Sequence, residues 1–430
     1  MRNAAIAILA MCLCASVFAG CLGAPDTESK DETPSENTAE TEYVPHVVVA
    51  IIDTGINPYH EIFRRPNTTA HPSTWLESFP KEVPALNLTF AEQYGDCYEA
   101  DKDEWTALKD GELVWFPGTN VMGMAAKRSP ADSAYPILDN GAHGTWVAGS
   151  VMEACPEAFI VSIQIDDDED IVAANEWAAK QPWIDIVTTS WGKYVIGIPP
   201  EYIEEYDMGI NHAEQLVYEA GKIQTNSAGN EPVPYIFDEH GGPHWNIAVG
   251  GAFAGTNGDA YMAAKFPDVV SDFTQDHLAK QKSTNGYETV SGTSFSCPRV
   301  AGTIAKALYE VRTALNYTGI IRNGSLIETA PSKGMLDDGK LMAGEVRTAL
   351  NRSAIYWTTT DFQPGNVDAI PINPVAPWLQ MGWGYVNKTM APTIAGSILG
   401  TIPLPEKDIA AITYNQANYE LRKAYWENLG

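Results

Sequence analysis

The sequence has few basic residues, no hydrophobic run long enough for a membrane span, and few cysteines. Its 430 residues contain 27 Lys and Arg against 55 Asp and Glu, which gives a formal charge of −28. A surface this acidic repels phosphate backbones, so we expect no nucleic acid partner. The hydrophobic content of 45% is ample for a packed core and excludes a wholly disordered chain. No internal repeat of solenoid length is present, which argues against a repeat architecture.

A stretch of small and apolar residues without charge lies at the N-terminus and predicts an export signal over residues 1–20. It runs from Ala4 to Gly20, which is shorter than the roughly 20 apolar residues of a membrane span. The segment ends in Phe18-Ala19-Gly20-Cys21, which resembles the lipobox of bacterial and archaeal lipoproteins. That resemblance implies lipidation at Cys21. The alternative is an ordinary cleaved signal with an incidental cysteine.

Residues 21–43 are acidic and carry almost no apolar side chains, so they predict a disordered tether. Such a tether would hold a folded body away from an anionic membrane surface. We therefore expect an extracytoplasmic, cell-surface lipoprotein, with a secreted protein as the alternative. Beyond Cys21 only Cys97, Cys155 and Cys297 follow, so they predict neither a disulfide framework nor a zinc site.

Three polar residues of the remaining chain stand where α/β folds place functional groups. Asp53 follows Val47–Ile52, an apolar run that predicts a buried strand of a parallel sheet, whose carboxyl end faces the ligand crevice. His143 is flanked by glycines and opens a helix of small residues. Ser294 lies just ahead of Pro298, at the start of a predicted helix where the positive potential favours an oxyanion. Strand-helix-strand alternation over 159–192 predicts an α/β fold with right-handed crossovers.

The segments around these residues resemble the signatures of the subtilisin-like serine peptidases, in that family's Asp, His, Ser order. The matching segments are Asp53-Thr54-Gly55, His143-Gly144-Thr145-Trp146-Val147-Ala148-Gly149 and Gly292-Thr293-Ser294-Phe295-Ser296-Cys297-Pro298-Arg299-Val300-Ala301-Gly302. The resemblance implies a three-layer α/β fold, with a mostly parallel central sheet and helices on both faces. It covers a catalytic domain at about 44–395, with an insertion at about 61–139 that we expect to be a surface elaboration. Residues 396–430 form a C-terminal extension.

The resemblance also assigns roles to residues. It implies that Ser294 is the nucleophile, that His143 is the general base and then acid, and that Asp53 orients the imidazole. The side chain of Asn230 and the backbone N–H of Ser294 would stabilise the oxyanion. Two cleft walls would pair with an extended polypeptide substrate. Their residues are Ser190, Trp191 and Gly192 on one side and Ala228 and Gly229 on the other.

We therefore expect a monomeric, exported serine endopeptidase that acts on polypeptides and needs no cofactor for its chemistry. The alternatives are a catalytically idle binding module of the same fold and a different acyl hydrolase with the same triad. A structural calcium ion, which many relatives bind, is compatible with the sequence, but we assign no metal ligands. The acidic run 166–170 lacks a spaced ligand loop and suits a helix N-terminus instead. Arg299 replaces a histidine common in the family, and we expect it only to tune the site.

Overall fold

The computed structural model describes most of the chain from residue 45 onward. The described residues are 45–109, 111–125, 137–139, 141–191, 208–230, 242–252, 260–261, 267–355, 381–404, 413, 416–417, 419–420 and 422–424. They belong to one compact unit that spans Tyr43–Gly430. The predicted signal, the tether and Cys21 lie outside the described residues.

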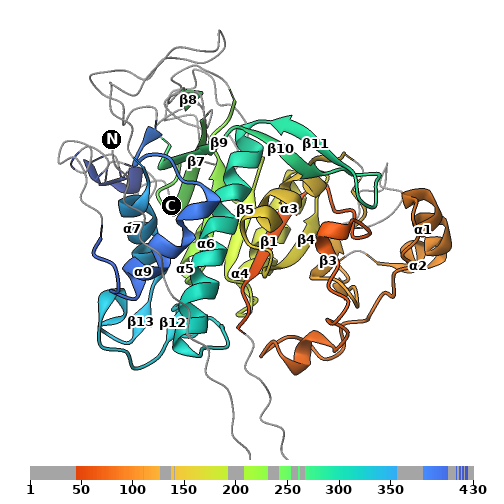
Figure 1. Cartoon of the computed structure of the whole chain (residues 1–430), viewed down its shortest axis with the longest axis horizontal. Helices are drawn as coiled ribbons and strands as arrows, with labels where there is room; N and C mark the ends of the chain where they lie inside the picture. The colour runs from red at the N-terminus through yellow and green to blue at the C-terminus, as the bar shows by residue number, and fades with distance from the viewer. Residues whose placement is uncertain are drawn as a thin grey trace, which may run out of the picture. The chain divides into compact units, whose positions relative to one another are not determined.

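The centre of the unit is a sheet in the order β2-β3-β4-β1-β5-β6-β7-β8, with β9 also paired to β7 (Figure 1). Its strands are β1 (Val48–Asp53), β2 (Val114–Trp115), β3 (Val121–Ala125), β4 (Phe159–Gln164), β5 (Ile186–Thr189), β6 (Ile223–Ser227), β7 (Asn246–Ala252), β8 (Ala260–Tyr261) and β9 (Val269–Asp272). Only the β2/β3 and β7/β8 pairs are antiparallel. Two small antiparallel pairs are β10 (Thr274–Ala279) with β11 (Tyr287–Ser291) and β12 (Ile327–Glu328) with β13 (Lys340–Leu341).

Helices connect the strands and cover the sheet. They are α1 (Tyr94–Ala100), α2 (Lys102–Ala107), α3 (His143–Ala154), α4 (Asp168–Ala179), α5 (Met208–Glu219), α6 (Thr293–Leu315), α7 (Ala343–Ser353) and α9 (Ala391–Ile398). Short 3-10 helices are η1 (Glu61–Phe63), η2 (Pro72–Thr74), η4 (Gly334–Leu336) and η5 (Lys388–Met390). The acidic run before α4 caps that helix, since the side chain of Asp167 accepts a hydrogen bond from the backbone N–H of Asp170 at 2.9 Å.

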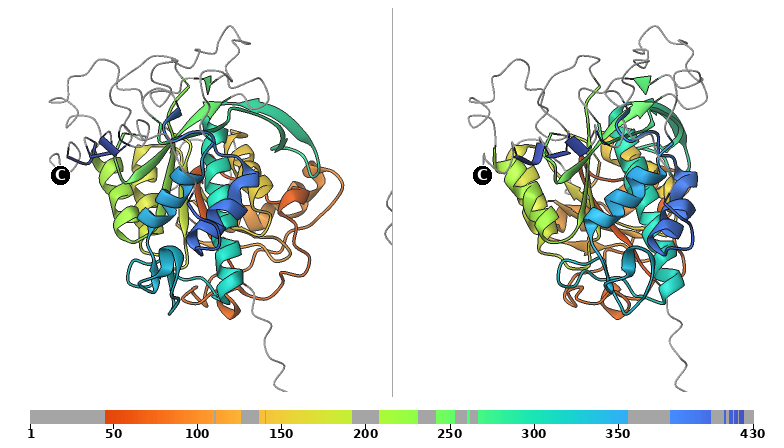
Figure 2. Two further views of the ribbon diagram at one scale, coloured as in Figure 1. Left: turned by 60° about the vertical axis from the view of Figure 1, so that its left-hand side comes forward. Right: turned by 90° about the vertical axis from the view of Figure 1, so that its left-hand side faces the viewer.

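The helices form two layers because β1 is apolar on both faces. Val49 and Ile51 pack in a cluster with residues of α3, α6, α7 and α9. Ala50 and Ile52 pack in a second cluster with residues of α4 and α5. Figure 2 shows α5 and α6 on opposite sides of the strands. The predicted α/β fold, with a mostly parallel sheet and helices on both faces, is confirmed.

The order of the sheet positions the carboxyl end of β1 at a crevice. After β1 the chain builds β2, β3 and β4 on one side, and then passes to β5 and β6 on the other side. Ligands of α/β sheets bind where the strand order reverses in this way. Asp53, the last residue of β1, therefore lies at the place where we expect a functional site.

The segment between β1 and α3 adds to the core in its described part. Phe63, Trp105 and Phe116 are buried, and β3 extends the parallel sheet beside β4. In the C-terminal extension, Arg422 donates from Nε to the Gly242 carbonyl at 2.6 Å and lies 3.1 Å from Asp268. These contacts attach Arg422 to the segments that precede β7 and β9.

The described part of the chain contains no helix that is both long and apolar enough to cross a membrane. It also contains no group of three or more His, Cys, Asp or Glu side chains arranged to hold a metal ion. Cys97, Cys155 and Cys297 are buried free thiols. Burial raises the pKa of Cys297 to about 11, which favours the protonated thiol at neutral pH.

Candidate active site

The side chains of Asp53 and His143 form a hydrogen-bonded pair at the end of β1. His143 Nδ1 lies 2.8 Å from Oδ1 and 3.0 Å from Oδ2 of Asp53. Asp53 is 1% exposed, and its Oδ1 also accepts the Thr54 N–H at 2.7 Å. The imidazole is half-buried, so its other nitrogen, Nε2, can face a reactant. An acceptor on Nδ1 selects the tautomer in which Nε2 is free of hydrogen and basic.

A glycine next to the histidine permits this pairing. A Cβ at Gly144 would lie 2.1 Å from the carbonyl oxygen of Gly55, so only glycine lets the start of α3 approach the turn after β1 this closely. Gly55 has φ +110°, in the region that favours glycine. The glycines of both motifs therefore bring Asp53 and His143 together.

A buried carboxylate anchors the loop that carries His143. Asp139 accepts the Thr54 hydroxyl at 2.9 Å, the Gly141 N–H at 3.0 Å and the Thr145 N–H at 2.8 Å. Burial raises the pKa of Asp139, and these hydrogen bonds oppose the rise. Our sequence reasoning missed Asp139, although its position four residues before His143 was an available signal.

Opposing effects act on the pKa of His143. Burial of the ring lowers it, whereas the negative charge of Asp53, the hydrogen bond that the ring donates to that carboxylate and the charge of Asp139 raise it. The net result is a pKa above the ordinary value of 6.5. The imidazolium that forms when His143 accepts a proton is thereby stabilised.

Ser294 is the second residue of α6, directly after Gly292 and Thr293. Gly292 has φ +151°, which only glycine adopts readily, and this conformation turns the chain from β11 into the helix. Pro298 has no N–H, so the Ser294 carbonyl lacks its usual helical donor four residues later. The Ser190 hydroxyl supplies that donor instead, at 2.7 Å. Ser294 Oγ lies 3.4 Å from the Ser190 carbonyl oxygen.

The helices that carry Ser294 and His143 pack against each other near the site. The ring of Phe295, the residue after Ser294, lies 5.4 Å from the His143 ring between centroids. It also contacts Trp146 edge to face at 5.9 Å. The serine and the histidine are thus held on neighbouring helix starts, with Phe295 between α6 and α3.

Asn230 faces the start of α6 through its side chain. Its Oδ1 accepts the Thr293 N–H at 2.8 Å and the Thr293 hydroxyl at 3.0 Å. These bonds assign the carbonyl oxygen of the amide to Thr293. The amide nitrogen, Nδ2, therefore points away from Thr293 and lies near Gly292. As the second residue of α6, Ser294 has a backbone N–H without an acceptor four residues earlier. This arrangement can offer two N–H donors to one oxyanion.

The expected cleft walls follow β5 and β6, which are neighbours in the sheet. Ser190 and Trp191 come directly after β5, and the Trp191 side chain is 38% exposed. Ala228 and Gly229 come directly after β6, and Gly229 has φ +93°. Gly192 lies outside the described residues.

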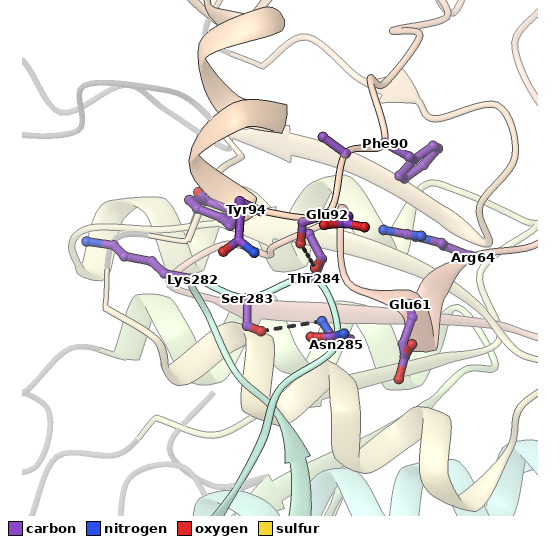
Figure 3. A pocket seen from close by; sticks show the side chains of 11 residues that line it. Glu61, Arg64, Phe90, Glu92, Tyr94, Lys282, Ser283, Thr284 and Asn285 are labelled. Atoms are coloured by element: carbon purple, nitrogen blue, oxygen red, sulfur yellow. Dashed lines mark hydrogen bonds between the residues drawn. The ribbon is translucent and has the colours of Figure 1, made fainter.

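A separate cavity of about 510 Å³ lies between the insertion and the tip of the β10–β11 hairpin. Figure 3 shows Arg64 and Glu92 on one side of it and Ser283 and Asn285 on another. Its charged lining residues are Glu61, Arg64, Glu92 and Lys282, which balance in sign. None of the expected catalytic or cleft residues lines this cavity, so we do not identify it as the substrate site.

Comparison with known proteins finds one matching family model and several similar proteins. The model of the subtilase family matches residues 45–354. The subtilisin-like protease het-Q2 of Podospora anserina is 23% identical over 304 residues, covering 65% of this chain and 73% of that protein. The crystal structure of a lanthipeptide protease is similar at 17% identity and a TM-score of 0.49, covering 81% of this chain and 87% of that one. The prenylagaramide maturation protease PagA shows 16% identity and a TM-score of 0.48, covering 82% and 94%.

Proposed function

Since the chain belongs to the subtilase family of serine peptidases, we propose that it is an active endopeptidase with Ser294, His143 and Asp53 as its catalytic triad. The hydrogen bond between His143 Nδ1 and the buried Asp53 carboxylate is the observation that supports this most directly. An idle binding module has no need of a base held in its reactive tautomer. Asp53 and His143 come from elements 90 residues apart, yet they meet at 2.8 Å.

The proposed reaction proceeds through an acyl-enzyme. Ser294 Oγ attacks the carbonyl carbon of the scissile peptide bond while its proton passes to His143 Nε2. The carbonyl oxygen becomes an oxyanion, which Asn230 Nδ2 and the Ser294 N–H stabilise. The C–N bond then breaks, and His143 returns the proton to the leaving amine. A water molecule activated by His143 cleaves the ester in the same way. These steps require no cofactor, and we assign no calcium ligands.

We propose polypeptides as the substrates because of the two cleft walls. Backbone groups after two neighbouring strands can pair with an extended chain as added strands, which a lipid ester cannot do. By the family resemblance, glycine at positions 192 and 229 would leave the primary specificity pocket open for the side chain before the scissile bond. Trp191, with its exposed ring, would contact a residue further along the substrate.

Labelling with a fluorophosphonate tests the proposed function without a guess at the substrate. The probe reacts with a serine only when a neighbouring base activates it. We expect stoichiometric labelling of the purified full-length protein, with the adduct mapped to Ser294 by mass spectrometry. The Ser294→Ala variant should remain unlabelled, and Ser296→Ala, two residues along the same helix, should label normally.

The labelling rate should depend on pH through His143. Only the neutral imidazole accepts the serine proton, and the pKa of His143 is raised above 6.5. The rate should therefore fall as the pH drops below that raised pKa and level off above it. If the folded protein is not labelled at any pH between 6 and 9, the binding-module alternative replaces the proposal.

We also propose that the protein is exported and anchored by a lipid on Cys21, as a monomer at the cell surface. The proposal rests on the Phe18-Ala19-Gly20-Cys21 segment and on the acidic residues that follow it. Intact-mass measurement of the protein purified from membranes should show a chain that begins at residue 21 and carries acyl groups. A mature N-terminus without added mass would show that the signal is of the ordinary cleaved kind.

A further inference from the structure

A buried arginine joins the helix of the proposed nucleophile to the helix of the proposed base. Arg299 lies on α6, five residues after Ser294, and is 3% exposed. Its Nη2 lies 2.9 Å from Oε2 of Glu153 and donates to Oε1 of Gln275 at 2.6 Å. Glu153 belongs to α3, the helix that begins at His143. The ion pair therefore connects two elements whose relative position sets the distance between serine and histidine.

Gln275 extends this connection to the residue beside Ser294. Its Nε2 donates to the carbonyl oxygen of Phe295 at 2.7 Å. The hydroxyl of Ser150, on α3, lies 2.8 Å from Gln275 Oε1 and 3.0 Å from the same Phe295 oxygen. Ser150 and Gln275 are also buried. One glutamine thus connects Arg299, α3 and the first turn of α6 through buried side chains.

Burying the polar groups of this network costs free energy, so stability alone does not explain it. Arg299 Nε and Nη1 are buried and have no hydrogen-bond partner among the described residues. Buried polar groups without partners cost free energy, and a buried ion pair is often no better for stability than apolar side chains of similar size. What the network supplies instead is a fixed geometry, because charged hydrogen bonds tolerate little displacement.

A second ion pair on α6, between Lys306 and Glu157, provides a comparison with Arg299. Lys306 Nζ lies 2.6 Å from Oε1 of Glu157, which follows α3, and the two side chains are 25% and 35% exposed. This pair is about two turns further from Ser294 than Arg299 is, and no described contact leads from it to the first turn of α6. It is a natural control for Arg299.

We propose that Arg299 is a positioning residue that holds the first turn of α6 against α3 and so sets the approach of Ser294 to His143. The inference rests on the proposed function. It goes beyond the expectation that Arg299 only tunes the site. A displacement of about 1 Å between reacting groups can cost about 100-fold in rate, so a partial loosening should be measurable.

The test compares Arg299→Met with Lys306→Met in the full-length protein, at a temperature well below both melting transitions. For Arg299→Met we expect an approximately tenfold lower second-order rate of fluorophosphonate labelling and a similar fall in kcat, with KM changed less than twofold. Lys306→Met should leave labelling and kcat within twofold of wild type. Equal labelling of Arg299→Met and wild type, or equal losses in both variants, overturns the proposal.

Two further variants separate positioning from folding. Arg299→Lys keeps the charge, but its single ammonium should serve both acceptors less well, so an intermediate loss of rate is expected, and this variant replaces Arg299→Met if the latter does not fold. The double variant Arg299→Met/Glu153→Met removes both charges and should regain thermal stability without regaining the labelling rate. Recovery of both would assign Arg299 a structural role only. Absence of labelling in the wild type would instead disprove the proposed function.

Discussion

Replacing His143 with alanine should lower kcat for peptide hydrolysis by about 10⁶-fold, a magnitude taken from subtilisin, where loss of either the serine or the histidine has this effect. A serine hydroxyl is a poor nucleophile when nothing accepts its proton, and the leaving amine departs poorly when nothing returns one. His143 performs both transfers in the proposed mechanism. Its ring is anchored on Nδ1 by Asp53, which leaves Nε2 for both transfers. The measurement is kcat on a peptide substrate found after labelling.

A histidine outside the site provides the matched control. His277 lies exposed on β10, where its ring stacks on Tyr287 at 3.6 Å. His277→Ala should retain wild-type activity. The double variant His143→Ala/Ser294→Ala should be no slower than either single variant, because the two residues act as one unit. If the two single-variant losses in kcat added up in the double variant, Ser294 and His143 would not act in the same step.

The motifs of the proposed site could be predicted from the sequence because each is local. The apolar run before Asp53 predicts a buried strand, the small residues after His143 predict a helix, and Pro298 predicts the first turn of a helix. The structure has β1 ending at Asp53, α3 beginning at His143 and α6 beginning at Thr293. The order of these motifs then indicates the family.

The contacts that hold the motifs in place could not be predicted, because they depend on packing between distant segments. Arg299 and Glu153 are 146 residues apart, and Ser190 and Ser294 are 104 apart. Nothing in the local sequence of Arg299 distinguishes a buried ion pair from a solvated charge. The pairing of β3 with β4 in the parallel sheet was not predicted either, since we expected the insertion to be a surface elaboration.

Replacing Asp53 with asparagine should lower kcat by about 10⁴-fold at neutral pH while leaving the fold intact, by analogy with serine peptidases of the trypsin type. The expected loss of activity comes from a change in the tautomer of the His143 imidazole. The Thr54 N–H donates to Oδ1 at 2.7 Å, so this position must remain an oxygen. The oxygen at Oδ1 lies 2.8 Å from His143 Nδ1, but the amide nitrogen then takes the Oδ2 position at 3.0 Å, where its hydrogens would oppose a proton on Nδ1, so we expect the amide to donate to Nδ1. The ring proton moves to Nε2, which can no longer accept the proton of Ser294.

The control for this variant is Asp139→Asn, which changes a buried carboxylate in the segment before α3 that makes no hydrogen bond with the imidazole among the described contacts. Asp139 accepts hydrogen bonds from Thr54, Gly141 and Thr145. Its replacement should lower the melting temperature, and should shift the pH profile of labelling to lower pH, because the charge of Asp139 helps to raise the pKa of His143. The rate at high pH should fall less than tenfold. If the labelling rate of Asp53→Asn at high pH also fell less than tenfold, Asp53 would act on His143 through its charge alone. Control of the tautomer requires direct contact with Nδ1, whereas an effect of charge does not.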